Sequence, residues 1–153
     1  MSGVEVIAVG ASVIAIIQIT DRIIGLCKFY IETAGDAPSD LRLILVETSM
    51  LKTIFENLQF LTACSSETSA TVHRLAAKDG PIEGCWRSIS ELEKLFPSDC
   101  VQGTGQSRGK KRKMKAAWAA MAWPLKESKA KKLMDEITRY KMTISLALTA
   151  ESM

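Results

Sequence analysis

The sequence is poor in the residues that most metal and catalytic sites need. It has a single histidine, His73, and its four cysteines, Cys27, Cys64, Cys85 and Cys100, form no C-x-x-C pair. Because zinc sites are built from closely spaced Cys and His ligands, we expect no metal and no cofactor. Scattered cysteines also indicate a reducing compartment, in which thiols serve mainly as small apolar residues.

Motifs of the common enzyme classes are missing as well. The chain has no glycine-rich phosphate loop followed by Lys-Ser or Lys-Thr, no G-x-S-x-G elbow and no H-E-x-x-H pair. Paired acids such as Asp135 and Glu136 stand beside lysines and arginines, which is typical of solvated helix surfaces. The sequence therefore predicts a protein that is not an enzyme.

No segment shows the sustained alternation of a strand, and helical periodicity is present instead. With 153 residues, of which 47% are apolar and 24% charged, the chain has the size and composition of one globular domain, 1–153. We therefore expect an all-α fold, a single up-and-down bundle of four to five main helices with a long N-terminal helix.

Charge is absent from the stretch VIAVGASVIAIIQIT, which runs from Val6 to Thr20 and contains eight Val or Ile residues. A secretory signal peptide is not expected, because the chain begins MSGVEV with Glu5 and no early Lys or Arg. The apolar pattern also continues without a break into DRIIGLCKFYIE. We therefore predict one apolar N-terminal helix over residues 1–34.

The length of this stretch is borderline for a membrane span. Fifteen helical residues cover roughly 22 Å, whereas the 20 residues from Met1 to Thr20 reach the ~30 Å of a hydrocarbon core, with Glu5 as their only charge. The small residues Gly10, Ala11, Ser12 and Ala15 suit close helix packing. In the resting protein we expect a buried bundle helix, since helices apolar on all sides are usually core helices.

Four further helical patterns follow along the chain. Gly35 and Pro38 separate the first helix from a long amphipathic one, and a short helix ends at the DGP turn, 79–81. The predicted apolar lines are Leu41, Ile44, Leu45, Thr48, Leu51, Phe55, Leu58 and Leu61; Val72, Leu75 and Ala76; Ile82, Cys85, Trp86, Ile89, Leu92 and Phe96; and Leu133, Ile137, Tyr140, Ile144 and Leu148. The last of these lines lies on a helix predicted from about Leu125 to Ala150.

Between these patterns lies a strongly basic region. Residues 97–109 have the composition of a flexible loop, and a basic, Ala-rich helix is predicted after it, with Met114, Trp118 and Met121 on one side and Pro124 at its end. From Arg108 to Lys132 there are ten Lys or Arg and one acid, Glu127. The candidate contacts to anionic lipid are Arg108, Lys110, Lys111, Arg112, Lys113 and Lys115. A solvated surface is the alternative; a nucleic-acid or nuclear-targeting patch is a weaker one, so no nucleic-acid partner is expected.

Three segments together resemble a known family. They are the acid followed by the Gly/Ala-interrupted apolar helix, DAPSDLRLILVETSMLKTIFENL (36–58), and WPLKESKAKKLMDEITRYKMTISLAL (123–148). The most specific parts are Trp123 to Glu127 and Arg139 to Leu148. This pattern resembles the HeLo-like domain at the N-termini of fungal NOD-like receptor (STAND) proteins, which is related to the HeLo domain and to the four-helix bundle of the mixed-lineage kinase domain-like necroptosis executioner.

The resemblance implies a function in programmed cell death and innate immunity, including heterokaryon incompatibility. Such domains are cytoplasmic at rest; an upstream NOD-like receptor or amyloid signal then leads them to oligomerise and insert the N-terminal helix into the plasma membrane. Carried over, the membrane-inserting residues are Val4, Glu5, Val6, Ile7, Val9, Gly10, Val13, Ile14, Ile16, Ile17 and Ile19. The alternative is a non-lytic oligomerisation or partner-binding module of such a receptor. The run from 108 to 115 is longer and more basic than the family pattern, so its role is inferred from charge alone.

Overall fold

The computed structural model describes residues 3–33, 39–64, 70–96 and 123–152, with side chains from residue 9 in the first helix and from residue 128 in the last. The helices are α1 (Gly3–Thr33), α2 (Ser39–Cys64), α3 (Ala70–Leu75), α4 (Pro81–Glu93) and α6 (Trp123–Ser152). The described residues contain no strand. The expected all-α class is therefore confirmed.

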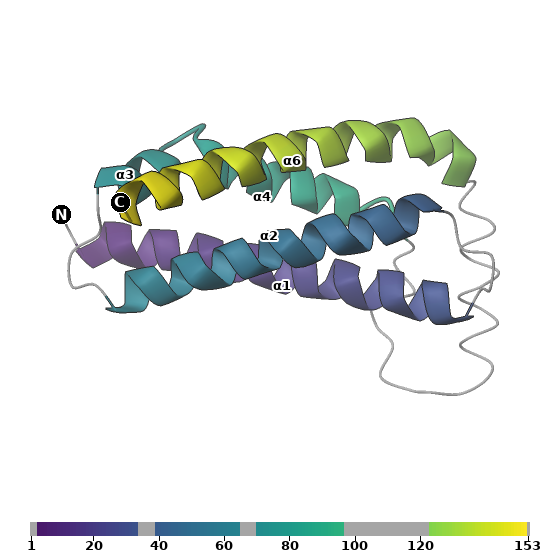
Figure 1. Cartoon of the computed structure of the whole chain (residues 1–153), viewed down its shortest axis with the longest axis horizontal. Coiled ribbons are helices and arrows are strands. Elements are labelled where there is room, and N and C mark those ends of the chain that lie inside the picture. Colours follow the sequence, from purple (N-terminus) through teal and green to yellow (C-terminus); the bar gives the residue numbers. More distant parts are fainter. Residues whose placement is uncertain (1–2, 34–38, 65–69, 97–122, 153) are drawn as a thin grey trace.

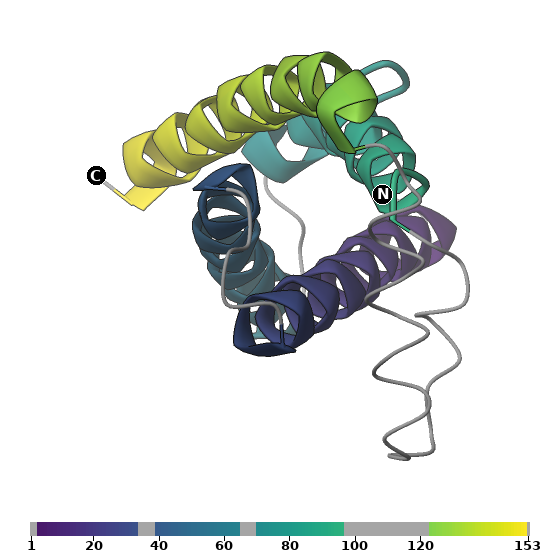
Figure 2. The same cartoon turned by 90° about the vertical axis from the view of Figure 1, so that its right-hand side faces the viewer.

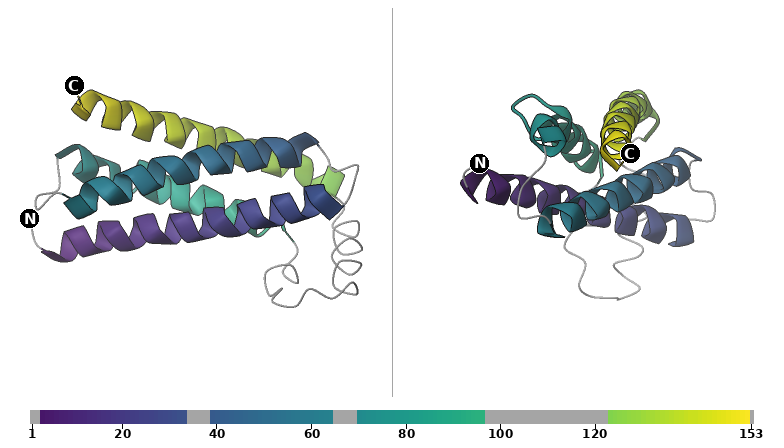
Figure 3. Two further views of the ribbon diagram at one scale, coloured as in Figure 1. Left: turned by 60° about the horizontal axis from the view of Figure 1, so that its bottom comes forward. Right: turned by 60° about the vertical axis from the view of Figure 1, so that its left-hand side comes forward.

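The four longer helices form an up-and-down bundle (Figure 1). Successive long helices run in opposite directions, which is also visible from below and from the side in Figure 3. Viewed nearly end-on, they lie in the ring order α1, α2, α6, α4 (Figure 2), and each helix contacts its two neighbours in that ring. The short α3 contacts α6 and leads through a turn into α4.

The predicted apolar lines form the core. Side chains that are essentially inaccessible to solvent come from all four long helices: Val13, Ile16, Ile23, Leu41, Ile44, Leu51, Phe55, Leu58, Ile89, Leu92, Ile137 and Ile144. Burying a Val, Leu, Ile or Phe side chain contributes about 1.5–3 kcal/mol, so the bundle is held together mainly by this cluster.

Two residues of the predicted lines lie outside this core. Leu61 is 47% exposed and Trp86 is 42% exposed. Leu61 is one turn beyond the buried Leu58, where the helix surface has rotated toward a groove between α2 and α6. Trp86 stands at the edge of the buried face of α4 and lines a second groove, beside α1. These two residues follow the predicted apolar lines but are not part of the buried core.

The boundary before the last helix also differs from the prediction. α6 begins at Trp123, so Pro124 lies in its first turn and does not end a preceding helix. Proline is well tolerated there, because the first amides of a helix have no partner within the helix. The predicted loop over 97–109 and residues 110–122 of the predicted basic helix lie outside the described residues.

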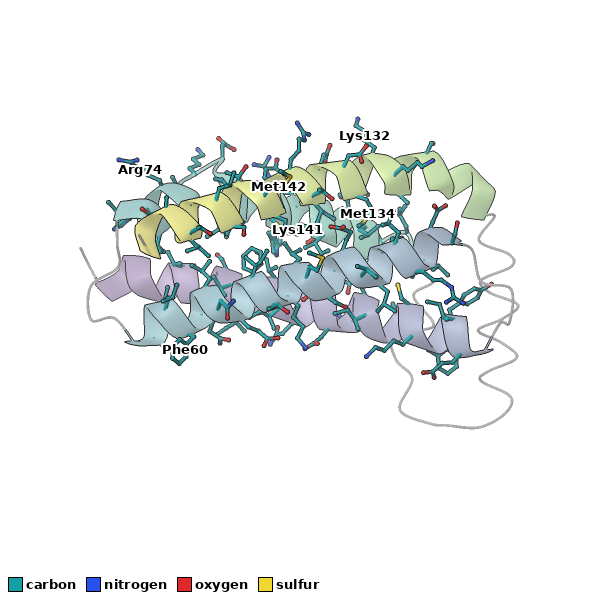
Figure 4. The ribbon with its side chains drawn as sticks, in the orientation of Figure 1. Phe60, Arg74, Lys132, Met134, Lys141 and Met142 are labelled. Carbon is teal, nitrogen blue, oxygen red and sulfur yellow. The ribbon has the colours of Figure 1, made fainter. Side chains whose placement is uncertain are left out.

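Two contacts set the spacing of α6 against its neighbours. A Cβ on Gly84 of α4 would lie 2.5 Å from the Tyr140 ring, so the absence of a side chain lets α4 and α6 approach closely. On the other side, the 8%-exposed Lys141 reaches between α6 and α2 (Figure 4), where its Nζ is 2.5 Å from Glu47 Oε2. A buried cation needs such a partner, because desolvation without pairing is costly.

Candidate functional site

The candidate site is α1, because the predicted membrane-inserting residues lie on it. Its buried face carries Val9, Val13, Ile16 and Ile19, and Ile17 is partly buried against the same core. Gly10 is half-buried, whereas Ile14 is 43% exposed. Val4, Glu5, Val6 and Ile7 belong to the helix, but their side chains lie outside the described residues. The helix that was predicted to be buried in the resting bundle is therefore buried along one face only, and 39% of its most apolar window lies inside the bundle.

The other side of α1 carries small, polar and charged side chains, and its charges begin at Asp21. Ala11, Ser12, Gln18 and Gly25 are exposed along it, together with Ile14. No atom outside the glycine's immediate neighbours and its own helix backbone comes within 4 Å of a Cβ built at Gly10 or at Gly25. From Val9 to Gln18, α1 is thus buried on one face and exposed on the other, as expected of a helix in a four-helix ring.

A groove of about 680 Å³ separates part of α1 from α3 and α4. Ala11, Ser12 and Ala15 line it from α1, and His73, Ile82 and Trp86 face them. Small side chains make fewer contacts across such a gap than the Ile and Leu side chains that fill the bundle centre. Along this groove, α1 therefore presents only small side chains from Ala11, Ser12 and Ala15 toward α3 and α4.

Two ion pairs tie the middle of α1 to its neighbours. Asp21 Oδ1 lies 2.5 Å from Lys52 Nζ of α2, and Arg22 Nε lies 2.7 Å from Glu93 Oε2 on the last turn of α4. A second hydrogen bond joins Arg22 Nη2 to Glu93 Oε1 at 3.2 Å. The hydrogen bonds to Glu93 and Asp21 raise the pKa of Arg22 and of Lys52, respectively, above their ordinary values.

These ion pairs define how α1 is positioned against α2 and α4, but they contribute little to the stability of the bundle. The Arg22 and Asp21 side chains are 43% and 54% exposed, and exposed pairs are screened by water and salt. Both partners are far away in sequence, and Glu93 is separated from Arg22 by 71 residues. Sequence reasoning missed the pairs; the only signal is that two charges, Asp21 and Arg22, directly follow the uncharged stretch.

α1 also has the length and composition of a membrane span. The segment Val9–Glu32 has 24 residues and a mean hydropathy of 1.6, and 39% of its most apolar window is buried inside the bundle. A core helix of a soluble protein passes the same test. Length and composition therefore agree with both states that the sequence predicts for this helix.

The thiols and acids near α1 offer little chemistry. Cys27 and Cys85 are free and buried, and desolvation raises the pKa of each thiol to about 12, so neither supplies a thiolate. Within the part of the chain that the structure describes, no group of three or more His, Cys, Asp or Glu side chains could hold a metal ion. His73 lies in the wall of the groove, beside Ala76 and Ala77.

The predicted lipid-contacting residues, Arg108 to Lys115, lie outside the described residues. No protein-family model, curated protein or solved structure matches the chain. The HeLo-like resemblance therefore stays a prediction.

Proposed function

We propose that the chain is a membrane-acting effector domain of the HeLo-like type, a bundle at rest that permeabilises an anionic membrane when copies associate. One observation carries the proposal. A helix long and apolar enough to cross a bilayer forms one side of the bundle, with small side chains along a groove and two partly exposed ion pairs that join it to α2 and α4.

The charged residues of α1 indicate which of its segments would enter the membrane. If Val9–Glu32 crossed the bilayer, Asp21 and Arg22 would lie at its middle, where each charged side chain costs about 2.5–3.5 kcal/mol. If Met1–Thr20 crosses, the only charge is Glu5 near one end, and Asp21 and Arg22 remain at the membrane surface. We therefore propose residues 1–20 as the inserted segment, with the ion pairs of α1 broken in that step.

The partners follow from charge. The six basic residues between Arg108 and Lys115 would be attracted to anionic headgroups at about 1 kcal/mol each. In the cell, the proposed order of events begins with a cytoplasmic resting form. A signal from an upstream NOD-like receptor or amyloid motif then activates the domain, which acts at the plasma membrane and leads to cell death.

Dye release from vesicles tests the proposal on the full chain. Deleting residues 1–20 would also remove core residues such as Val13 and Ile16, so the lipid is varied first. We expect dye release from vesicles of phosphatidylserine and phosphatidylcholine. Release from vesicles of phosphatidylcholine alone should be lower by roughly tenfold or more, because the cationic segment binds only the anionic vesicles.

Equal release from both vesicle types would contradict the lipid preference. A chain that self-associates but releases no dye from either type would instead favour the second candidate, a non-lytic oligomerisation or partner-binding module. That candidate is favoured by one observation of its own, the exposed apolar side chains of α2.

A further inference from the structure

α2 carries two apolar stripes with heptad spacing on opposite sides. The inward stripe is almost fully buried and consists of Leu41, Ile44, Thr48, Leu51, Phe55 and Leu58. A second stripe consists of the six exposed residues that each follow a residue of the inward stripe by two positions. We call it the outer seam: Leu43, Val46, Met50, Thr53, Asn57 and Phe60. Spacings of three and four residues in alternation are those of coiled-coil a and d positions.

The outer seam exposes more apolar surface than a solvated helix face normally does. Leu43, Val46, Met50 and Phe60 are between 48% and 67% exposed, and Phe60 projects away from the bundle at the C-terminal end of α2 (Figure 4). Near this end the seam adjoins a groove of about 350 Å³ between α2 and α6, lined by Ile54, Asn57, Phe60, Leu61, Ser145, Leu148 and Thr149. Large exposed apolar side chains gathered on one helix face favour an interaction site.

The size of the seam suits a pair of helices. Its 18 residues span roughly 27 Å of helix. At roughly 100 Å² each, its four large apolar side chains expose about 400 Å², half of the ~800 Å² that each partner contributes to a standard interface. A second helix of equal length would cover this apolar surface along its whole length.

The polar residues of the seam select the partner. If Leu43 is assigned to heptad position a, Asn57 also falls on an a position. An asparagine at a single a position specifies register and oligomer state in coiled coils. In a parallel pair in the same register, Asn57 faces Asn57 of the other copy and the two amides hydrogen-bond each other. The outer seam of a second copy is therefore a partner that supplies a hydrogen-bonding group opposite Asn57.

One pair of flanking charges, at the N-terminal end of the seam, agrees with a parallel pair. In the same heptad, Arg42 is a g position and Glu47 is the e position five residues later. In parallel coiled coils, g of one helix meets e of the other, so Arg42 of each copy meets Glu47 of the second copy. Glu47 already accepts Lys141 within its own chain, so the contact adds a second cation to that carboxylate.

We propose that the outer seam of α2 binds the same seam of a second copy as a parallel, in-register two-stranded coiled coil. This inference rests on the proposed function in one respect: it assigns to the outer seam the self-association that the proposed membrane action requires. The association itself is measured without lipid.

Disulfide trapping tests the register. In a chain carrying Cys64→Ser and Cys100→Ser, Asn57→Cys should form a covalent dimer on mild oxidation, since the same a position faces itself. The buried Cys27 and Cys85 are retained because they do not supply thiolates. Gln59→Cys, at an exposed position off the seam, is the matched control and should stay monomeric on a non-reducing gel. If the control cross-links as fully as Asn57→Cys, or if neither cross-links, the parallel seam is overturned.

Sedimentation equilibrium tests the surface itself. Val46→Glu places two carboxylates opposite each other in the seam and should weaken the dimer by roughly 100-fold or more in dissociation constant. Thr143→Glu, at an exposed position on α6, should leave it unchanged. A parent chain that stays monomeric at all concentrations, or a Val46→Glu chain that dimerises normally, contradicts the inference. A lipid-free dimer that releases no dye leaves the inference standing and defeats the proposed function instead.

Discussion

Ile14→Asp is expected to leave the resting bundle folded and to lower membrane insertion of α1 by roughly 100-fold. Ile14 is 43% exposed on α1, so a carboxylate there remains in water at rest. In the inserted segment 1–20 the same position lies about 5 Å from the middle of the span. An aspartate near the middle of a membrane helix costs about 3 kcal/mol or more relative to isoleucine, which corresponds to that loss of insertion.

Dye release and circular dichroism measure the two halves of this prediction. The thermal unfolding of the variant should match that of the parent chain, while its dye release from anionic vesicles should fall strongly. The matched control is Met142→Asp, which adds the same charge at a 56%-exposed position on α6 and should leave release unchanged. Equal loss in the two variants would mean that added charge, and not α1, determines release.

Ile16→Ala is expected to lower the free energy of unfolding by about 2–5 kcal/mol, because it removes a fully buried side chain and leaves a cavity. For a chain of this size the midpoint of thermal unfolding should fall by roughly 5–15 °C. The variant adds no charge, so α1 stays apolar while its hold on the bundle weakens. Dye release should therefore begin at a lower protein concentration than in the parent.

Ile14→Ala is the control for this second prediction. It is the same chemical change two residues away, at an exposed position, and should alter stability by no more than about 0.5 kcal/mol. If both alanine variants shift the unfolding midpoint equally, the assignment of Ile16 to the core is wrong. If Ile16→Ala unfolds earlier but releases dye no more readily, the release of α1 from the bundle does not limit the membrane step.

Periodicity predicted the helices well because the core of a bundle repeats with the helix. The expected N-terminal helix over 1–34 corresponds to α1 (Gly3–Thr33), and the line from Leu41 to Leu58 is the buried face of α2. The same reasoning misplaced Leu61 and Trp86, which share the spacing of a buried face but lie at its edge. Burial at the edge of a stripe depends on the neighbouring helix, which periodicity does not describe.

The polar contacts of the bundle could not be predicted in the same way. Lys141 reads as a surface lysine in sequence, yet it is buried because Glu47, 94 residues earlier, lies opposite it. The ties of α1 at Asp21 and Arg22 depend on Lys52 and Glu93 in the same manner. The outer seam of α2 was in the sequence as a second heptad pattern, but only the arrangement of the helices shows which of the two stripes the bundle leaves exposed.

A reversible tether between α1 and α4 tests the two-state account of α1 most directly. Arg22→Cys and Glu93→Cys, at the positions of the ion pair, would be joined by a short bis-maleimide that contains a reducible disulfide, in a chain carrying Cys64→Ser and Cys100→Ser. The account predicts that the tethered chain releases no more dye from anionic vesicles than a sample without protein, and that release returns when the tether is reduced. Full release while the tether is intact would contradict it, because α1 would then act on the membrane without leaving the bundle.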